Sequence, residues 1–487
     1  MAAPQAVPQT GARLQEAPSA RRRSLALAML LLPTALTLLS VTTVNVALPA
    51  IRDSLGATAV EQSLVLTSYT IAFALVLLPA GRLGDRYGHK QVFIAGVVVF
   101  TLASAWCGLA PDATQLILAR ILAGIAGGLV LTPLNALIQL LFTGPERAKP
   151  FAVMGAVFGA ASAAGPVLGG LLLQVGGEYG WHLIFLFNVP LGVLATVAAV
   201  LVIPRDNPLG ARGSDPLGML LFTAGILAVV LPFAAGTGVT PLNAALLAAG
   251  LLLMTGCMLW ERRRERRDSF AIVPPRLFRQ RALPIGIVST FLGFAGFTAS
   301  FLMLALLWLD GLGNDALAAG LVVTPFALGS VLGSLLSHSL SERFGTRIVT
   351  VGLTMISVCL LIVGALVLVL PAASLTFLVM LVPLLGIGLG VGLFVGPNTN
   401  AAFVQTASID AGIASALIAA AQRTGTAVGI GVISALYALA PGGSAALPNH
   451  ATAAFITAAM AGAAALVLVG SRRSAMPEPA EDDTEQF

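Results

Sequence analysis

The chain has 487 residues, of which 57% are hydrophobic and only 10% are charged, and its formal net charge is +5. A soluble domain has roughly a quarter of its residues charged, so this composition excludes an ordinary soluble protein. Apolar runs of roughly 18 residues or more recur along the chain, each long enough to cross a bilayer as a helix. Barrel strands would instead alternate polar and apolar residues. The sequence therefore predicts an all-α integral membrane protein.

The apolar runs divide into fourteen predicted transmembrane helices. The first run follows Arg21, Arg22 and Arg23, but it is too long for the apolar core of a signal peptide, so we expect it to be retained. The flanking segments 1–24 and 471–487 are expected to form a disordered N-terminus and a polar tail. The predicted spans cover residues 25–50, 62–80, 91–110, 114–141, 150–174, 182–203, 217–235, 241–260, 284–309, 316–340, 347–370, 373–397, 411–438 and 451–470.

The distribution of basic residues predicts the orientation of these helices. With the N-terminus in the cytoplasm, 23 of the 26 Lys and Arg residues fall in cytoplasmic segments, and only Arg52 lies outside. Both termini are therefore expected on the cytoplasmic side of the plasma (inner) membrane. The densest basic stretch, residues 261–281, directly follows a span. We expect it to lie against the anionic head groups of the lipid bilayer, and we favour this over a nucleic-acid patch.

An internal repeat divides the chain into two halves. The stretch SLSERFGTR at residues 339–347 resembles RLGDRYGHK at residues 82–90, and each lies between the second and third spans of a block of six. We therefore predict two pseudo-symmetric six-helix bundles, residues 25–203 and 284–470, joined by two inserted linker helices and a basic loop at residues 204–283. Two such halves around a site near the midplane of the membrane are the architecture of a secondary transporter.

The connector GRLGDRYGHK concentrates charges and glycines between two apolar runs. Its glycines allow a tight turn and a close approach of neighbouring helices. The carboxylate of Asp85 can face a helix N-terminus, where the dipole favours negative charge, or pair with a cytoplasmic arginine. Both contacts would form when the cytoplasmic helix ends close and break when they part, so the connector is a candidate latch. Its predicted members are Gly81, Asp85, Arg86, Gly88 and Lys90, with Glu342 and Arg343 in the second copy.

Two further motifs follow in spans 4 and 5. RILAGIAGG places Arg120 inside span 4, and GAVFGAASAAGPVLGG fills span 5 with small residues. Small residues let a partner helix pack closely, and a proline removes one backbone hydrogen bond and bends the helix. The span-5 stretch is therefore expected to serve the conformational change, through Gly159, Gly165, Pro166, Gly169 and Gly170.

Together these motifs resemble the major facilitator superfamily. GRLGDRYGHK is similar to its signature between the second and third helices, RILAGIAGG to its fourth-helix motif, and GAVFGAASAAGPVLGG to the motif of its antiporters. TTVNVALPAI in span 1 and WHLIFLFNVPLG at span 6 are similar to its fourteen-span drug:proton antiporter family. The resemblance implies a monomer that exports a small organic amphiphile, a drug or a secondary metabolite, by alternating access in exchange for protons. It implies no cofactor, with the proton gradient as the energy source.

The sequence departs from that family at a position tied to proton coupling. The family usually has an aspartate in span 1 where this chain has Ser40, and no other span carries an acidic residue deep in the bilayer. The ionisable residues that remain inside are Arg120 and Arg423, which we take as candidates for proton or substrate coupling. Because both are cationic, we expect anionic, zwitterionic or neutral amphiphiles as substrates in preference to lipophilic cations.

Polar residues in the central spans are candidates for the substrate pocket. LTPLN in span 4 and VGPNTN in span 12 occupy equivalent positions in the two halves, and each combines proline with asparagine. Polar residues in paired, proline-interrupted helices mark transporter sites. The candidate lining residues are Asn45, Tyr69, Asn135 and Gln139 from the first half and Trp308, Asn398 and Asn400 from the second.

Other functional classes lack their sequence signatures. The chain has no GxxxxGK[ST] loop for ATP, and its four histidines form no metal-binding or catalytic spacing. No metal site and no catalytic residue are therefore predicted, and the protein is not expected to be an enzyme. The alternatives that remain open are an uncoupled facilitator, an importer, and a non-transporting sensor built on the same scaffold.

Overall fold

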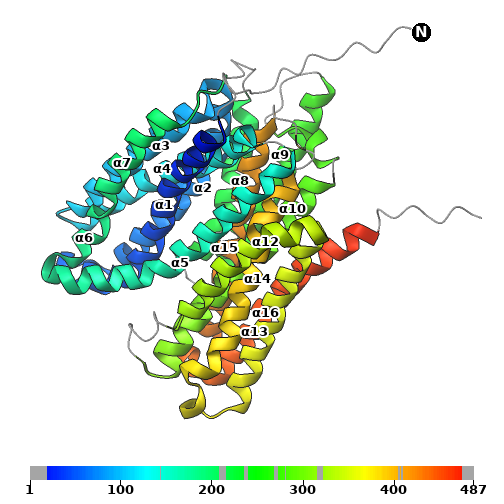
Figure 1. The fold of residues 1–487 in the computed structure, drawn as a ribbon. Helices are drawn as coiled ribbons and strands as arrows, with labels where there is room; N and C mark the ends of the chain where they lie inside the picture. Colours follow the sequence, from blue (N-terminus) through cyan, green and yellow to red (C-terminus); the bar gives the residue numbers. More distant parts are fainter. Residues whose placement is uncertain are drawn as a thin grey trace, which may run out of the picture.

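The computed structural model describes residues 19–142, 144–207, 215–234, 240–267, 273–279, 281–314, 322–403, 406 and 410–473. Long helices account for nearly all of these residues (Figure 1). The first group of helices is α1 (Ala20–Leu55), α2 (Ala59–Tyr87), α3 (His89–Gly108), α4 (Ala113–Leu141), α5 (Ala148–Gly176), α6 (Gly180–Leu186) and α7 (Asn188–Val202). Two linker helices follow, α8 (Pro216–Ala234) and α9 (Pro241–Arg266). The last group is α10 (Ala282–Leu306), α12 (Thr324–Phe344), α13 (Arg347–Val369), α14 (Phe377–Phe403), α15 (Ala411–Leu439) and α16 (Leu447–Arg473).

The helices agree with the prediction of a multi-pass helical membrane protein. Eleven of the described helical segments are long and apolar enough to cross a bilayer. Most helices extend past the predicted spans, because helical hydrogen bonding continues after the chain leaves the apolar layer. The predicted sixth span at 182–203 is instead divided into α6 and α7, which meet at Phe187. Pro190 explains the division, since its ring nitrogen cannot donate the helical bond of that turn.

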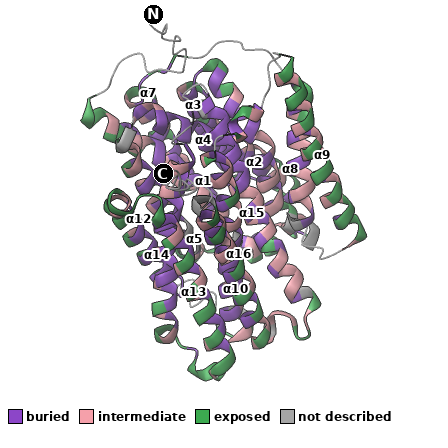
Figure 2. Cartoon of the chain, turned by 90° about the vertical axis from the view of Figure 1, so that its right-hand side faces the viewer, coloured by how far each residue is buried: buried purple, intermediate pink, exposed green. Residues whose placement is uncertain are grey.

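The helices pack as two bundles with the linker pair beside them (Figure 1). In the first bundle α4 packs against α2 and α3, and α1 packs against α5. In the second, α12 packs against α14, α13 against α16, and α10 against α15. The linker helix α8 contacts both α2 and α15, so it touches each bundle, whereas α9 lies at the edge with much of its surface exposed (Figure 2).

A polar cluster at the start of α8 fastens the two linker helices together. The carboxylate of Asp215 accepts hydrogen bonds from the backbone of Gly218 at 2.9 Å and from the indole of Trp260 at 3.1 Å. The Nε atom of Arg264 lies 3.3 Å from the same carboxylate. Asp215 therefore caps α8 and binds the end of α9, and this explains how the pair remains together beside the bundles.

Candidate functional site

The two bundles meet where α2 packs against α15 and α5 packs against α14, at the end of the molecule where Asp85 lies. A Cβ atom built on Gly81 of α2 would lie 2.8 Å from the carbonyl oxygen of Gly412 in α15. At the neighbouring crossing, a Cβ on Gly396 of α14 would lie 2.8 Å from the Cα atom of Ala152 in α5. Ser415 of α15 adds a hydrogen bond to the carbonyl oxygen of Thr132 in α4, at 2.7 Å. Glycine thus brings backbones from opposite bundles into contact, and this end of the molecule is closed.

Asp85 lies at this closed end, against the first turn of α15. A Cβ atom on Gly412 would be 2.6 Å from its Oδ1 atom. The same carboxylate lies 3.7 Å from the Nη1 atom of Arg82 and 3.5 Å from the Nε2 atom of His89. The side chain is almost completely buried. A carboxylate from the first bundle therefore faces the positive end of a helix dipole from the second.

The other predicted latch residues in this connector make contacts within the first bundle. Gly88 has a φ of 99°, a left-handed value that favours glycine and lets α2 end and α3 begin in one residue. Lys90 donates from Nζ to the carbonyl oxygens of Val200 at 2.9 Å and Ile203 at 2.5 Å. Arg86 lies over the ring of Tyr87, 5.2 Å from its centroid. These residues shape the connector, while Asp85 and Gly81 reach the other bundle.

A residue that the sequence did not single out caps the helix after the connector. Asp206, in the segment after α7, accepts hydrogen bonds from the backbone N–H groups of His89 at 2.6 Å and Lys90 at 3.2 Å. It thereby satisfies two free donors at the start of α3. Asp206 lies 117 residues from His89 in sequence, so no local pattern could have paired them.

The second copy of the connector does not repeat these contacts. The side chain of Glu342 is 69% exposed and lies 3.7 Å from His338, one turn earlier on the same helix. Arg343 is also exposed. A separate ion pair at the start of α15 joins Asp410 to Arg276, which lies in the segment after α9, at 3.0 Å. The two copies of the connector are therefore similar in sequence, but their acidic residues make different contacts.

The glycines of α5 differ in what they contact. Gly159 faces Ser330 of α12 in the opposite bundle, and Gly165 faces Thr42 of α1 in its own bundle. A Cβ on Gly169 would lie 3.2 Å from the carbonyl oxygen of Thr43, whereas one on Gly170 would meet no atom within 4 Å. The side chain of Pro166 lies outside the described residues. Among the predicted glycines of this motif, Gly159 is the one that faces the other half, and Gly155 at the start of the motif does so as well, since a Cβ there would lie 3.3 Å from the backbone nitrogen of Gly396 in α14.

We expect Gly159→Val to reduce transport about tenfold, because its added methyl groups would separate α5 from α12, and overpacking of this kind costs about 1–3 kcal/mol. Gly170→Val is the matched control on the same helix, since its Cβ position is open. The two variants would be compared in a transport assay after equal incorporation into vesicles. Equal losses in both would contradict a specific role for the α5–α12 contact.

Two arginines from different bundles lie inside the helical assembly, Arg120 buried and Arg423 half-buried. Arg120 of α4 is 1% exposed, donates from Nε to the carbonyl oxygen of Val65 at 3.0 Å, and donates from Nη1 to the hydroxyl of Ser40 at 3.3 Å. Its guanidinium carbon lies 4.4 Å from the ring centroid of Tyr69. Arg423 of α15 approaches from the other bundle. The two candidate coupling residues therefore enter one region from opposite halves.

Arg423 stacks on an aromatic ring one helical turn from Tyr69. Its guanidinium carbon lies 3.9 Å from the ring centroid of Phe73, and the Tyr69 and Phe73 centroids are 6.1 Å apart. The hydroxyl of Tyr69 donates to the carbonyl oxygen of Thr37 at 3.3 Å. α2 thus presents two rings that hold two cations by cation–π attraction.

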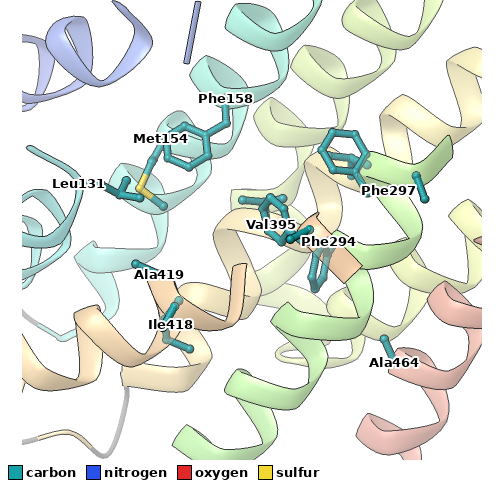
Figure 3. Packing of buried hydrophobic residues seen from close by; sticks show 14 of the residues in the cluster. Leu131, Met154, Phe158, Phe294, Phe297, Val395, Ile418, Ala419 and Ala464 are labelled. Carbon is teal, nitrogen blue, oxygen red and sulfur yellow. The ribbon is translucent and has the colours of Figure 1, made fainter. Parts of the chain in front are cut away.

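A small cavity lies between the bundles, and Gln422, the residue before Arg423, is part of its lining. Figure 3 shows packed apolar side chains from both bundles, among them the lining residues Leu131, Met154 and Phe158 from α4 and α5. Its polar lining comes from four helices, α4, α10, α14 and α15. The lining residues are Leu131, Asn135, Met154, Phe158, Thr290, Phe294, Val395, Thr399, Ile418 and Gln422.

The predicted pocket residues take different places around this cavity. Asn135 lines it directly. Asn398 lies just behind, where it donates to the hydroxyl of Thr290 at 2.9 Å and accepts from that of Ser289 at 2.8 Å. The remaining candidates are not among the lining residues, and the side chain of Asn45 lies outside the described ones. Tyr69 packs on Arg120, Gln139 lies one turn beyond Asn135, Asn400 is half-buried on α14, and Trp308 lies in the π-turn Leu307–Gly311 that follows α10.

Sequence reasoning missed most of the apolar lining. Met154, Phe158, Phe294, Val395 and Ile418 sit in apolar runs, where residues that face lipid, core or cavity have the same composition. Gln422 carried a signal, because it precedes Arg423 inside a span. Only the crossing of helices distant in sequence decides which apolar residues face the cavity.

Comparisons with known proteins agree with this architecture. The family model described as "Major Facilitator Superfamily" matches residues 30–430. A probable actinorhodin transporter of Streptomyces coelicolor is 32% identical over 428 residues, covering 86% of this chain and 73% of the relative. The puromycin resistance protein pur8 of Streptomyces alboniger is 33% identical, covering 88% and 84%. The putative multidrug resistance protein MdtD of Escherichia coli is 33% identical, covering 65% and 66%.

Solved structures share the fold at low sequence identity. The proton:xylose symporter XylE superposes with a TM-score of 0.67 at 14% identity, covering 93% of this chain and 96% of that one. A POT family peptide transporter superposes with a TM-score of 0.63 at 16% identity, covering 93% and 98%.

Proposed function

The chain belongs to the Major Facilitator Superfamily and is a membrane transport protein, and from this premise we propose that it exports small organic amphiphiles in exchange for protons. Relatives that are a probable actinorhodin transporter and a puromycin resistance protein support export of a drug or a secondary metabolite. The proposed transporter acts as a monomer in the plasma membrane.

The proposed topology has fourteen spans and both termini in the cytoplasm. The six-helix halves are residues 25–203 and 284–470, and the connecting segment 204–283 contributes the two linker helices. The bias of basic residues to one side supports this orientation. The closed end, with Asp85 against α15, would then be the cytoplasmic end.

The observation that carries the proposal is a closed end beside a central cavity, both built from the two bundles. Contacts of α2 with α15 and of α5 with α14 close the end that carries Asp85. The cavity between the bundles is lined from both sides. Rocking of the bundles about this cavity would break the closed end and expose the cavity to the cytoplasm, which is alternating access.

An uncoupled facilitator is the second candidate, and Ser40 favours it. The hydroxyl at this position contacts Arg120 but has no carboxylate that could carry a proton. Every carboxylate in the described part of the chain lies near a helix end or in a connector. An experiment must therefore distinguish proton coupling through Arg120 and Arg423 from uncoupled transport.

The deciding experiment measures flux in proteoliposomes with and without an imposed proton gradient. A panel of cationic, neutral and anionic amphiphiles would be loaded, and release would be followed by fluorescence. Proton-coupled export predicts flux that is faster with the gradient and that falls when a protonophore dissipates it. Flux that is unchanged by the protonophore would identify a facilitator. Absence of flux for every compound would favour the non-transporting sensor.

A further inference from the structure

We infer that the centre of this transporter is a binding site for an organic anion, held between Arg120 of one bundle and Arg423 of the other. This inference names the substrate class and rests on the proposed transport function. The ligand chemistry that fits is a carboxylate or similar anionic group on an apolar, aromatic body.

The first support is that two cations from opposite bundles meet on one pair of rings. Arg120 lies over Tyr69 and Arg423 over Phe73, and the two rings follow each other on α2 with centroids 6.1 Å apart. Both guanidinium groups therefore lie on one pair of adjacent rings, and like charges repel one another more strongly away from water. An anion between them would remove that repulsion and would contact both halves of the transporter.

The second support is that neither cation is neutralised. Among the described residues, no carboxylate forms an ion pair with Arg120 or Arg423. Arg120 contacts only neutral oxygens, those of Ser40 and Val65. Its Nη2 atom and the Nε atom of Arg423 are buried without a hydrogen-bond partner. Buried charges are normally paired, and aromatic rings supply only part of what a counter-ion gives.

The third support is the lining of the adjacent cavity. Gln422 lines it and directly precedes Arg423, and Asn135, Thr290 and Thr399 add polar groups. The rest of the lining is apolar and includes the rings of Phe158 and Phe294. This lining matches the chemistry of an aromatic body with a few hydrogen-bonding groups, and the cavity, about 10 Å³ in this closed state, would have to widen to admit one.

Ser40 decides the net charge of this site. Because its hydroxyl lies 3.3 Å from the Nη1 atom of Arg120, a carboxylate at position 40 would form an ion pair there. Ser40→Asp would neutralise one of the two cations without truncating either. Ser40→Ala removes the hydroxyl and leaves both cations, so it is the matched control.

The test is equilibrium dialysis of the full-length protein in nanodiscs of zwitterionic lipid, with empty nanodiscs to subtract partition into lipid. The probes are 2-naphthoate, 2-naphthamide and 2-naphthylmethylamine, which share one aromatic body and differ in charge. We expect 2-naphthoate to bind at least about tenfold more tightly than the other two, as a charge-assisted contact implies. Ser40→Asp and Arg423→Gln should each weaken that binding about tenfold, and Ser40→Ala, which changes no charge, should weaken it less than either.

Several results would overturn the inference. Equal binding of the three probes, or no saturable binding of 2-naphthoate, would exclude an organic-anion site. Binding of 2-naphthoate that Ser40→Asp leaves unchanged would place the anion elsewhere. Repeating the measurement at low and at high chloride tests for an inorganic ion, because loss of all 2-naphthoate binding at high chloride would show that the arginines hold chloride instead.

The binding assay and the transport assay test the two proposals separately. If 2-naphthoate binds selectively but no compound is transported, the anion site stands and the proposed export does not. If cations are exported under a proton gradient while the naphthalene series shows no charge preference, export stands and the anion site does not.

Discussion

Replacing Asp85 with asparagine should open the closed end and reduce export about tenfold. The carboxylate lies against the first turn of α15 and near Arg82 and His89, and asparagine keeps its shape but removes its charge. A carboxylate at a partly buried helix N-terminus is worth up to about 2 kcal/mol. Losing about 1.4 kcal/mol would lower the population of the closed state tenfold relative to the open one.

Distances between spin labels on the ends of α2 and α15 would report this change directly. Glu342→Gln is the matched control, because Glu342 occupies the equivalent position of the repeat but is exposed and lies beside His338 on its own helix. We expect longer distances in Asp85→Asn and an unchanged distribution in Glu342→Gln. Similar shifts in both variants, or none in Asp85→Asn, would show that Asp85 does not hold this end closed.

Arg120→Leu should abolish most export while leaving the protein as stable as before or more stable. Arg120 is a buried cation that pairs with none of the described carboxylates and is held by two hydrogen bonds to neutral oxygens and by the ring of Tyr69. Replacing buried charged groups by apolar residues of similar volume is often neutral or stabilising, by about 1–4 kcal/mol. Loss of a charged contact to a ligand typically costs about 1.5–3 kcal/mol, so export should fall at least about tenfold.

The unfolding temperature and the export rate must therefore be measured on the same preparation. If Arg120 is retained for function, export falls in Arg120→Leu and the unfolding temperature does not. Arg120→Lys serves as a second variant, because lysine keeps the charge but lacks the planar fork that contacts Val65 and Ser40 together. A large drop in unfolding temperature for Arg120→Leu would assign Arg120 to structure, and full export in that variant would contradict its role.

The linker helices show which features a sequence pattern can predict and which it cannot. The apolar runs at 217–235 and 241–260 predict two helices, and the structure has α8 at Pro216–Ala234 and α9 at Pro241–Arg266. The pattern is sufficient because a segment in a bilayer must pair its backbone N–H and C=O groups within itself, as a helix does, whatever its neighbours are. That Asp215 would bind Trp260 and Arg264, and that α8 would touch both bundles, could not be read from it.

The repeat shows the same limit at the latch. Asp85 and Glu342 occupy matching positions of similar sequences, yet Asp85 is buried against α15 and Glu342 is exposed. Sequence similarity between the copies reflects the turn that both must make, and glycine at positions 88 and 345 has positive φ in each. The contacts of each carboxylate depend on how the two bundles pack together, and the turn does not determine that packing.

The sequence alone determined that this protein is a helical membrane protein, because composition and span length follow from the demands of a bilayer on each segment separately. It also located the two arginines, since a charge inside an apolar run is visible in one dimension. Only the tertiary structure placed Ser40 beside Arg120, Arg423 on Phe73, and Asp206 at the start of α3. These contacts join helices tens to hundreds of residues apart, and their geometry is decided by helix crossings that no local pattern encodes.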